Sequence, residues 1–288
     1  LKIESIDLKQ RELPSDLQAL LVIGPKEPFG EEELKKIDSF IIGGGKAGFL
    51  IDRVDVDLNT FMAKKVNTNI DTIPLCYGIK VKDGLVLDLR NQTVGLTSVR
   101  GGFIMRNFVP YPPFPIATDF NRENPIVREL ESVTLPFVSP LEGGEPLVRS
   151  SERSWWEENP RTLDPLEGLP PPGGKEKGPF PLVSILSGRF KSLFSDREGE
   201  SRIAVVGTSK IAERRFASPS SLAFFMNLID WLAEDEDLIT IRSKGVGERP
   251  LRELSPGKRT AVKQLNIFLP PLLLLGLGLA RWRARRRR

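Results

Sequence analysis

Hydrophobic and polar positions along the first part of the chain predict a strand, a helix and a second strand. The run LQALLVIGP is short, apolar and closed by Gly-Pro, as expected of a buried parallel strand. In FGEEELKKIDSFIIGGG, the apolar residues Leu34, Ile37, Phe40 and Ile41 recur at helical spacing between glutamates and glycines. KAGFLID is the next extended run. This order within residues 1–52 predicts a parallel sheet with right-handed crossovers.

A similar pattern returns later in the chain. FPLVSILSGRF and SRIAVVGTS read as strands, and SPSSLAFFMNLIDWLAEDEDL reads as an amphipathic helix that serines can cap. We expect the strands near Leu20–Gly24, Ala47–Ile51 and Ile203–Gly207 to lie in one sheet. The predicted fold class is therefore α/β, with a largely parallel sheet flanked by helices.

Composition divides the chain further. Residues 157–181 are rich in proline, glycine and charge, which is typical of a linker or long surface loop. We expect a body over residues 1–243, in which an inserted subdomain with this linker occupies about residues 103–181. A juxtamembrane stem over 244–263 follows. The chain begins at Leu1 directly before a strand-like run, so we expect the natural protein to begin further upstream.

The segment from Gln264 to Ala280 carries no charge, and at about 1.5 Å per residue it is just long enough to cross a thin hydrocarbon core. A buried core helix is the alternative, but a basic terminus follows. We predict a transmembrane helix over 264–282 and a cytoplasmic tail over 283–288. The positive-inside rule then places the body outside the cytoplasm, at the plasma (inner) membrane. Anionic inner-leaflet lipids would bind the terminal arginines, which are Arg281, Arg283, Arg285, Arg286, Arg287 and Arg288.

Charge and residue usage exclude several functions. The net charge of +4 comes from the terminal arginines, and the rest of the chain is slightly acidic, so the sequence predicts no nucleic-acid surface. The chain has no histidine and one cysteine, Cys76. Histidine-dependent nucleophile systems, zinc sites and an internal disulfide are thereby excluded. We expect Cys76 to be a small buried hydrophobic residue.

The glycine pattern Gly43-x-Gly45-x-x-Gly48 matches a dinucleotide-binding motif only as letters. That motif needs a strand before it and a helix after it, and here the order is reversed. We expect these glycines to end a helix and form a tight turn. No cofactor is predicted.

Two polar groups follow predicted buried strands, where open α/β sheets usually bind ligands. Asp52, Asp55 and Asp57 could hold a hard cation, but such carboxylates more often cap turns. In the second group, the hydroxyls of Thr208 and Ser209 and the ammonium of Lys210 could receive an anion, or they could form a plain strand-to-helix connection. We predict no metal, and we treat Asp52 and the loop from Thr208 to Lys210 as candidate ligand-binding residues.

Trp155 and Trp156 are further candidates. Exposed tryptophans can stack on sugars or on a partner protein, whereas paired tryptophans can also seal the edge of a core.

The order of segments along the whole chain resembles the GldG-like family, the auxiliary components of ABC transport systems linked to gliding motility. The likeness begins with LLVIGPKEPFGEEELKKIDSFIIGGGKAGFLID and continues through LCYGIKVKDGLVLD, RSSERSWWEE, RIAVVGTSKIA and LAFFMNLIDWLAEDEDLITIRSK. The resemblance implies a bacterial protein with a flavodoxin- or amidotransferase-like body, a further N-terminal membrane helix, and association with an ABC permease and its ATPase. Relatives often carry Gly-Asp-Ser-Asp after the late strand, whereas Thr208 and Lys210 stand here, so a cation role for that loop is not expected.

We therefore predict a non-catalytic, membrane-anchored accessory or interaction subunit of an ABC-type transport or gliding-motility system. One alternative is an extracytoplasmic subunit that binds a sugar or cell-wall fragment. A second alternative is a hydrolase that works with carboxylates alone, since histidine is absent.

Overall fold

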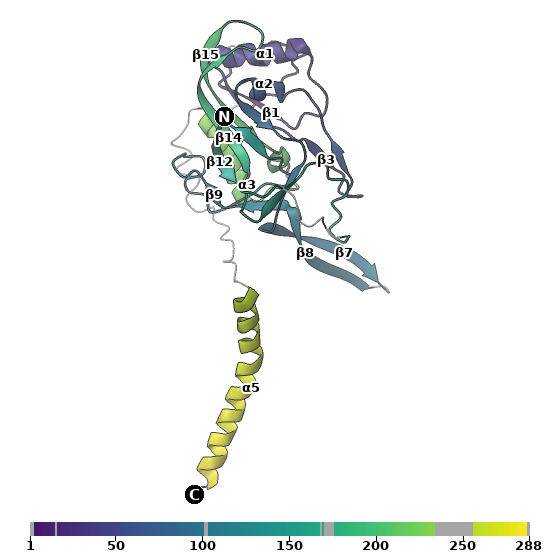
Figure 1. The fold of residues 1–288 in the computed structure, drawn as a ribbon, viewed down its shortest axis with the longest axis vertical. Coiled ribbons are helices and arrows are strands. Elements are labelled where there is room, and N and C mark those ends of the chain that lie inside the picture. Colours follow the sequence, from purple (N-terminus) through teal and green to yellow (C-terminus); the bar gives the residue numbers. More distant parts are fainter. Residues whose placement is uncertain are drawn as a thin grey trace. The chain divides into compact units, whose positions relative to one another are not determined.

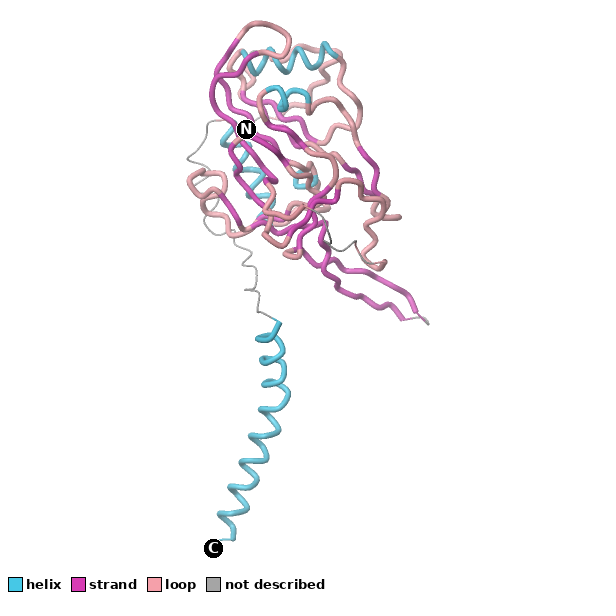
Figure 2. The backbone as a smooth tube through the Cα atoms, in the orientation of Figure 1, coloured by secondary structure: helices cyan, strands magenta, loops and turns pink. Residues whose placement is uncertain are grey.

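The computed structural model describes residues 3–14, 16–100, 103–167, 169, 176–233 and 256–286. The chain divides into two compact units, Leu1–Glu248 and Arg249–Arg288. The first unit is the body, and the second contains one long helix. Figure 2 shows that strands, rather than helices, make up most of the regular structure of the body.

The body is built on a six-stranded sheet in the order β1-β2-β15-β14-β12-β9 (Figure 1). Its strands are β1 (Ala19–Ile23), β2 (Lys46–Leu50), β15 (Glu198–Val206), β14 (Pro181–Lys191), β12 (Glu145–Arg149) and β9 (Asp119–Phe120). β1, β2 and β15 are parallel neighbours, as the sequence predicts. β14, β12 and β9 continue the sheet in antiparallel fashion.

The prediction of a largely parallel, flavodoxin- or amidotransferase-like sheet is therefore wrong. β14 and β15 form a long hairpin, in which Val183 pairs with Val206 and Lys191 pairs with Glu198. Only residues 192–197 join these two strands, and a parallel crossover needs a dozen residues or more. The two apolar runs are close together in the sequence, so antiparallel pairing is their only geometry.

Helices cover both faces of the parallel part of the sheet. α1 (Glu31–Ile42) buries Leu34, Ile37 and Ile41 in one core with Phe49 of β2. α3 (Pro219–Leu232) buries an apolar face in a second core, together with Leu50 of the same strand. Successive side chains of a strand point to opposite faces, which explains why these neighbouring residues belong to different cores. The short helices among the described residues are α2 (Thr72–Cys76) and the 3-10 helix η1 (Lys210–Ala212).

In the described part of the body there are four smaller antiparallel sheets, and their pairings are β10-β8-β7, β11-β5, β13-β6 and β3-β4. Strands β3, β6, β8 and β13 contribute to a third core that contains Tyr111, Phe137 and Trp155, whereas β5 and β11 pack in the same core as α1. The strands are β3 (Val54–Val56), β4 (Ala63–Lys65), β5 (Ile79–Val81), β6 (Leu85–Asp88), β7 (Asn91–Arg100), β8 (Phe103–Ala117), β10 (Val133–Thr134), β11 (Leu141–Gly143) and β13 (Ser154–Glu157).

The region that the sequence marks as an insertion, residues 103–181, contributes β9 and β12 to the six-stranded sheet. That residues 103–181 form a subdomain of their own stays a prediction. The predicted boundaries of the body, the stem, the transmembrane helix and the tail also stay predictions. Part of the expected stem, residues 244–255, lies outside the described residues. α5 (Pro256–Arg286) forms the described part of the second unit.

Candidate functional site

The carboxyl ends of the three parallel strands bring candidate residues from both predicted polar groups together. Asp52 follows β2, the loop Thr208–Lys210 follows β15, and Lys26 follows β1. Carboxyl ends of neighbouring parallel strands meet at one edge of a sheet. The sheet therefore explains why residues more than 150 positions apart in the sequence are in contact.

Asp52 is the centre of this cluster and is almost completely buried. Its Oδ1 accepts a hydrogen bond of 2.7 Å from the Ser209 backbone N–H, and its Oδ2 accepts one of 2.7 Å from the Ser209 hydroxyl. The same Oδ2 lies 3.2 Å from Lys210 Nζ and 3.8 Å from Lys26 Nζ. Burying a carboxylate is costly unless hydrogen bonds and cations compensate it, and here both are present.

Two more carboxylates surround the buried Lys210 ammonium. Glu213 Oε1 lies 2.8 Å from it, and Asp55 Oδ1 lies 3.5 Å away. Burial alone lowers the pKa of Lys210, but Asp52 and Glu213 outweigh burial and raise that pKa above its ordinary 10.5. Burial raises the pKa of Asp55, yet the ammonium groups of Lys26 and Lys210 lower it overall. Lys210 and Asp55 are thus each held in the charged form by their partners.

The backbone fits tightly around this cluster. Gly24 has a φ of +51°, and a Cβ at this position would lie 2.4 Å from Ser209 Oγ. The Thr208 hydroxyl donates a 2.7 Å hydrogen bond to the Pro136 carbonyl and accepts one of 3.1 Å from the Lys210 backbone N–H. Both hydroxyls that sequence analysis offers to an anion are therefore engaged within the protein.

The remaining predicted carboxylate, Asp57, is turned to its own loop, where it accepts hydrogen bonds from the Asn59 backbone N–H at 2.9 Å and from the Thr60 hydroxyl at 3.0 Å. It does not join Asp52. Among the residues that the structure describes, no three His, Cys, Asp or Glu side chains form a group suited to a metal ion.

The two tryptophans lie on β13 and have different environments. Trp155 is buried in the third core. Trp156 is half-buried, and its indole N–H donates a 2.7 Å hydrogen bond to the Asp83 carbonyl. The Lys82 ammonium lies 3.7 Å from the centre of the Trp156 ring. One face of the ring that could stack on a sugar is thus in contact with a lysine of the same chain.

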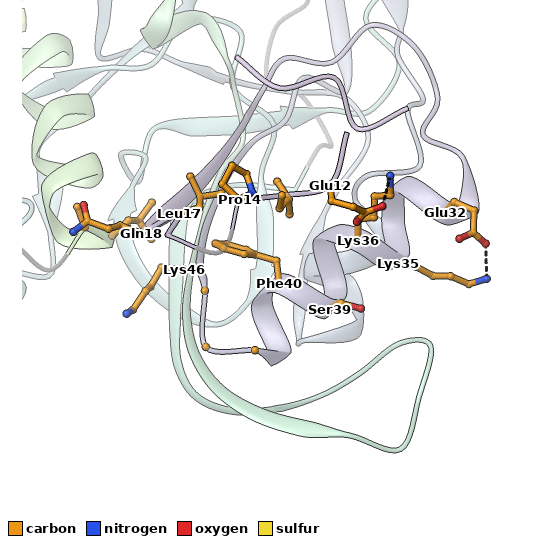
Figure 3. Close-up of a pocket in the computed structure, with 16 residues that line it drawn as sticks. Glu12, Pro14, Leu17, Gln18, Glu32, Lys35, Lys36, Ser39, Phe40 and Lys46 are labelled. Carbon is orange, nitrogen blue, oxygen red and sulfur yellow. Dashed lines mark hydrogen bonds and ion pairs between the residues drawn. The ribbon is translucent and has the colours of Figure 1, made fainter. Parts of the chain in front are cut away.

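A cavity of about 670 Å³ lies at the opposite edge of the sheet, where sequence analysis placed no site (Figure 3). It is lined by Leu17 and Gln18 before β1, by Phe40 of α1, by Lys46 at the start of β2, and by the end of α3. Ion pairs border it, with Lys35 at 2.9 Å from Glu32 and Lys36 at 2.9 Å from Glu12. Its one sequence signal is the triple glycine that ends α1.

That glycine turn has the predicted role. Gly43 caps α1, Gly44 has a φ of +95°, and β2 starts at Lys46. The interpretation as a helix end and turn is confirmed for Gly43 and Gly45, whereas Gly48 lies within β2. For Cys76 the prediction is wrong, because the residue ends α2 and is exposed rather than buried. Burial and the charge of Asp38 nevertheless raise the pKa of its thiol.

The second unit contains one helix that is long and apolar enough to cross a membrane by length and composition, Lys263–Arg283, with 21 residues and a mean hydropathy of 1.5. Large apolar side chains along it are exposed, among them Phe268, Leu274 and Trp282. No other described helix meets the same criteria.

These features define a class of protein with a mixed α/β body, an internally paired polar cluster and a separate apolar helix. Residues 1–240 match the model of the ABC transport auxiliary family, described as an ABC-type uncharacterized transport system. The chain belongs to this family. The expectation of an ABC transport auxiliary protein is confirmed at that level.

The chain is similar to an uncharacterized protein of Borreliella burgdorferi (strain ATCC 35210), with 26% identity over 312 residues. The match covers 100% of this chain and 60% of that relative, so the chain spans about three-fifths of its length. Among solved structures, the mmIFT52 N-terminal domain matches 75% of this chain and 77% of its own length, with 16% identity and a TM-score of 0.45.

Proposed function

We propose that this chain is a non-catalytic accessory subunit of an ABC-type transport system, anchored in the membrane by α5. One observation carries the proposal. At the sheet edge where α/β proteins usually bind ligands, the polar groups of Asp52, Ser209 and Lys210 are paired with one another. Because the polar groups at this sheet edge already bind one another, the edge suits a rigid scaffold or interaction domain better than a ligand-binding or catalytic site.

The membrane anchor rests on α5. Its uncharged stretch from Gln264 to Ala280 precedes a basic terminus, and Trp282 stands at the position where an indole favours the headgroup layer. The positive-inside rule puts the arginines in the cytoplasm, in contact with anionic lipids, and the body on the other side.

The partners follow from the family. The sequence has no G-x-x-x-x-G-K-[ST] loop, so a separate ATPase subunit would hydrolyse ATP, and a permease subunit would form the pathway. Within this class we place the chain in the GldG-like branch, with a role in gliding motility or a related export system. The order of segments along the chain supports that placement.

The alternatives receive less support. A sugar-binding subunit would need open hydroxyls and an open aromatic face, whereas Thr208 is hydrogen-bonded to Pro136 and Trp156 is covered by Lys82. A carboxylate hydrolase would need an acid with a raised pKa. The cations beside Asp55 and Glu213 overcome the effect of burial and lower the pKa of each.

The test is a mild-detergent purification of the full-length protein from its native membrane, followed by identification of the proteins that remain bound. We expect a permease and an ATPase in stoichiometric amounts. A matched purification of Leu274→Arg, in which a charge interrupts the apolar stretch, is the control for membrane-dependent capture. Recovery of the chain alone, under conditions that preserve other membrane complexes, would exclude the transport assignment.

A further inference from the structure

Strand β1 (Ala19–Ile23) forms one edge of the six-stranded sheet, next to β2 (Figure 1). Just beyond β1, the Gly24 N–H donates a 2.9 Å hydrogen bond to the Leu50 carbonyl of β2. Backbone groups of successive residues in a strand point to alternating sides. The groups that point to the outer side of β1 therefore belong to Ala19, Leu21 and Ile23. Among the described residues, no strand pairs with these outer groups.

This edge lacks the features that usually protect an edge strand, which are charges, proline, a bulge or a very short length. The opposite edge of the sheet has such features, because β9 contains two residues and one of them is Asp119. β1 has five residues, ALLVI, in continuous register with β2. The side chain of Ile23 is 43% exposed. β1 thus has the sequence of an interior strand at an edge position.

The sequence of β1 fits a second copy of itself. Two-fold symmetry pairs two identical strands antiparallel. The outward backbone groups select the register in which Leu21 lies opposite Leu21 of the second copy, since this register uses all of them, in about six hydrogen bonds. The other opposed pairs are Leu20 with Val22 and Ala19 with Ile23. Every side chain at the junction then meets an apolar side chain.

The charges beyond the two ends of β1 match in the same register. Asp16 precedes the strand and Lys26 follows it, so Asp16 of one copy comes level with Lys26 of the other. Asp16 is exposed, and it has no ion pair with another described residue. The Lys26 side chain is 55% exposed, although its Nζ lies 3.0 Å from Asp55. Pro25 has no N–H, so the ladder ends between the strand and this charge pair.

We infer that β1 is a docking edge for a second copy of this chain. Two β1 strands pair antiparallel about Leu21, and the two six-stranded sheets become one continuous sheet. Apolar and charged residues match in one and the same register, which favours an identical strand over an unrelated extended segment. A junction of five residues buries less surface than a standard interface, so we expect association in the micromolar range. This inference goes beyond the proposed accessory role and does not depend on it.

The first experiment measures the protein mass of the full chain in mild detergent over a range of concentrations, by light scattering after size exclusion. We expect an equilibrium between monomer and dimer. Ile23→Pro removes an outward N–H and leaves the hydrogen bonds to β2 in place, so it should raise the dissociation constant about tenfold or more. Ile23→Val keeps the N–H and is the matched control. It should change the dissociation constant by about twofold or less.

The charge pair is tested by Asp16→Lys. This variant replaces two attractions in the dimer with two repulsions, so it should raise the dissociation constant about fivefold at low salt. High salt should remove the difference from the unmodified protein. Asp196→Lys makes the same exchange in the exposed turn between β14 and β15, and it should leave association unchanged. Equal effects of the two variants would contradict a specific contact of Asp16.

Cross-linking tests the register in a Cys76→Ser background. Leu21→Cys places two cysteines opposite each other with Cα atoms about 5.5 Å apart, a distance that suits a disulfide, so oxidation should join two chains. The exposed change Gln18→Cys is the control, because its two copies are about 20 Å apart in this register. A mixture of Ala19→Cys and Ile23→Cys should cross-link more than either variant alone. This mixture tests the same register if Leu21→Cys does not fold.

Three results would overturn the inference. The first is a monomer at every concentration. The second is a dimer that Ile23→Pro leaves unchanged, since its interface would lie elsewhere, for example along α5. The third is cross-linking of Ile23→Cys in native membranes to a different protein, which would identify another occupant of this edge. The accessory role is tested separately by the proteins that purify with the chain, so either proposal can fail alone.

Discussion

The Lys210 ammonium lies 3.2 Å from Asp52 Oδ2, and both side chains are almost completely buried, although they follow two strands that are far apart in the sequence. This contact joins the carboxyl ends of β2 and β15. Ser209 adds two hydrogen bonds to the same carboxylate, one through its backbone and one through its side chain. The arrangement ties the last long strand of the body to its first strand–helix–strand unit.

Removing one partner of this pair should destabilise the body strongly. Asp52→Ala leaves a buried ammonium short of a counter-ion, and such losses cost about 3–5 kcal/mol. The cost should fall near the lower value, since Glu213 still lies 2.8 Å from Lys210 Nζ. Urea unfolding in mild detergent measures it. The double variant Asp52→Ala/Lys210→Met should recover part of the loss, and the exposed Asp57→Ala should cost about 1 kcal/mol or less. Equal costs for Asp52→Ala and Asp57→Ala would contradict a central role for the buried pair.

The same cluster predicts the response to acid. The lysines lower the pKa values of Asp55 and Glu213 below their ordinary 3.8 and 4.5, despite the opposing effect of burial. Each carboxylate therefore contributes stability that is complete above its ordinary pKa and is lost as pH falls through the lower folded value. The free energy of unfolding should decrease below about pH 4.5, and the decrease should be smaller in Lys210→Gln. A profile that Lys210→Gln leaves unchanged would show that other groups govern acid unfolding.

The sequence predicts the parallel part of the sheet, β1, β2 and β15, because the start and end of each element there are marked by residues within or next to that element. Apolar runs closed by glycine mark β1 and β2, and the glutamates and glycines around α1 mark its ends. The antiparallel half depends on which runs pair, and that depends on connection length. The connection formed by residues 192–197 is too short for a parallel crossover. The pattern of apolar and polar residues identifies the two strands but does not take the length of this connection into account, so it did not predict that they pair antiparallel.

The candidate site is predictable to a similar extent. The rule that ligands lie at the carboxyl ends of parallel strands selects Asp52 and the Thr208–Lys210 loop, and the structure places these residues together. The spacing of apolar residues cannot reveal that Ser209 and Lys210 bind the Asp52 carboxylate within the protein. That contact depends on Gly24, since a Cβ at this position would collide with the Ser209 side chain. The cavity beside Phe40 also has no pattern of its own, because three separate segments form it.

A second buried carboxylate, Asp38 of α1, should prove equally important for stability. It accepts hydrogen bonds from the Tyr77 hydroxyl at 2.5 Å, the Ser192 hydroxyl at 2.6 Å and the Leu193 backbone N–H at 3.0 Å. Asp38→Asn exchanges an acceptor for a donor, so we expect a loss of about 2–4 kcal/mol. Faster hydrogen exchange at the Leu193 amide would accompany it. The exposed change Asp196→Asn in the same turn is the control, and similar exchange in both variants would argue against this role of Asp38.

Trp156 should behave as a structural residue. Trp156→Phe removes the hydrogen bond to the Asp83 carbonyl and weakens the contact with Lys82, so the body should lose about 1–2 kcal/mol. Trp282→Phe on α5 is the matched control and should leave body unfolding unchanged. In the unmodified protein, added sugars should leave tryptophan fluorescence unchanged. A saturable fluorescence change that Trp156→Phe abolishes would instead support sugar binding.

Membrane anchoring by α5 is testable through one apolar position. Leu274 lies within the uncharged stretch and is exposed on the helix. An arginine near the centre of a spanning helix costs about 2.5–3.5 kcal/mol on insertion scales. Leu274→Arg should therefore shift a large fraction of the protein into the supernatant after alkaline carbonate extraction. Leu166→Arg makes the same exchange at an exposed position of the body and should leave the protein in the membrane pellet. If both variants remain in the pellet equally, the apolar helix is not what holds the chain in the bilayer, and the anchor has to be sought in another part of the protein.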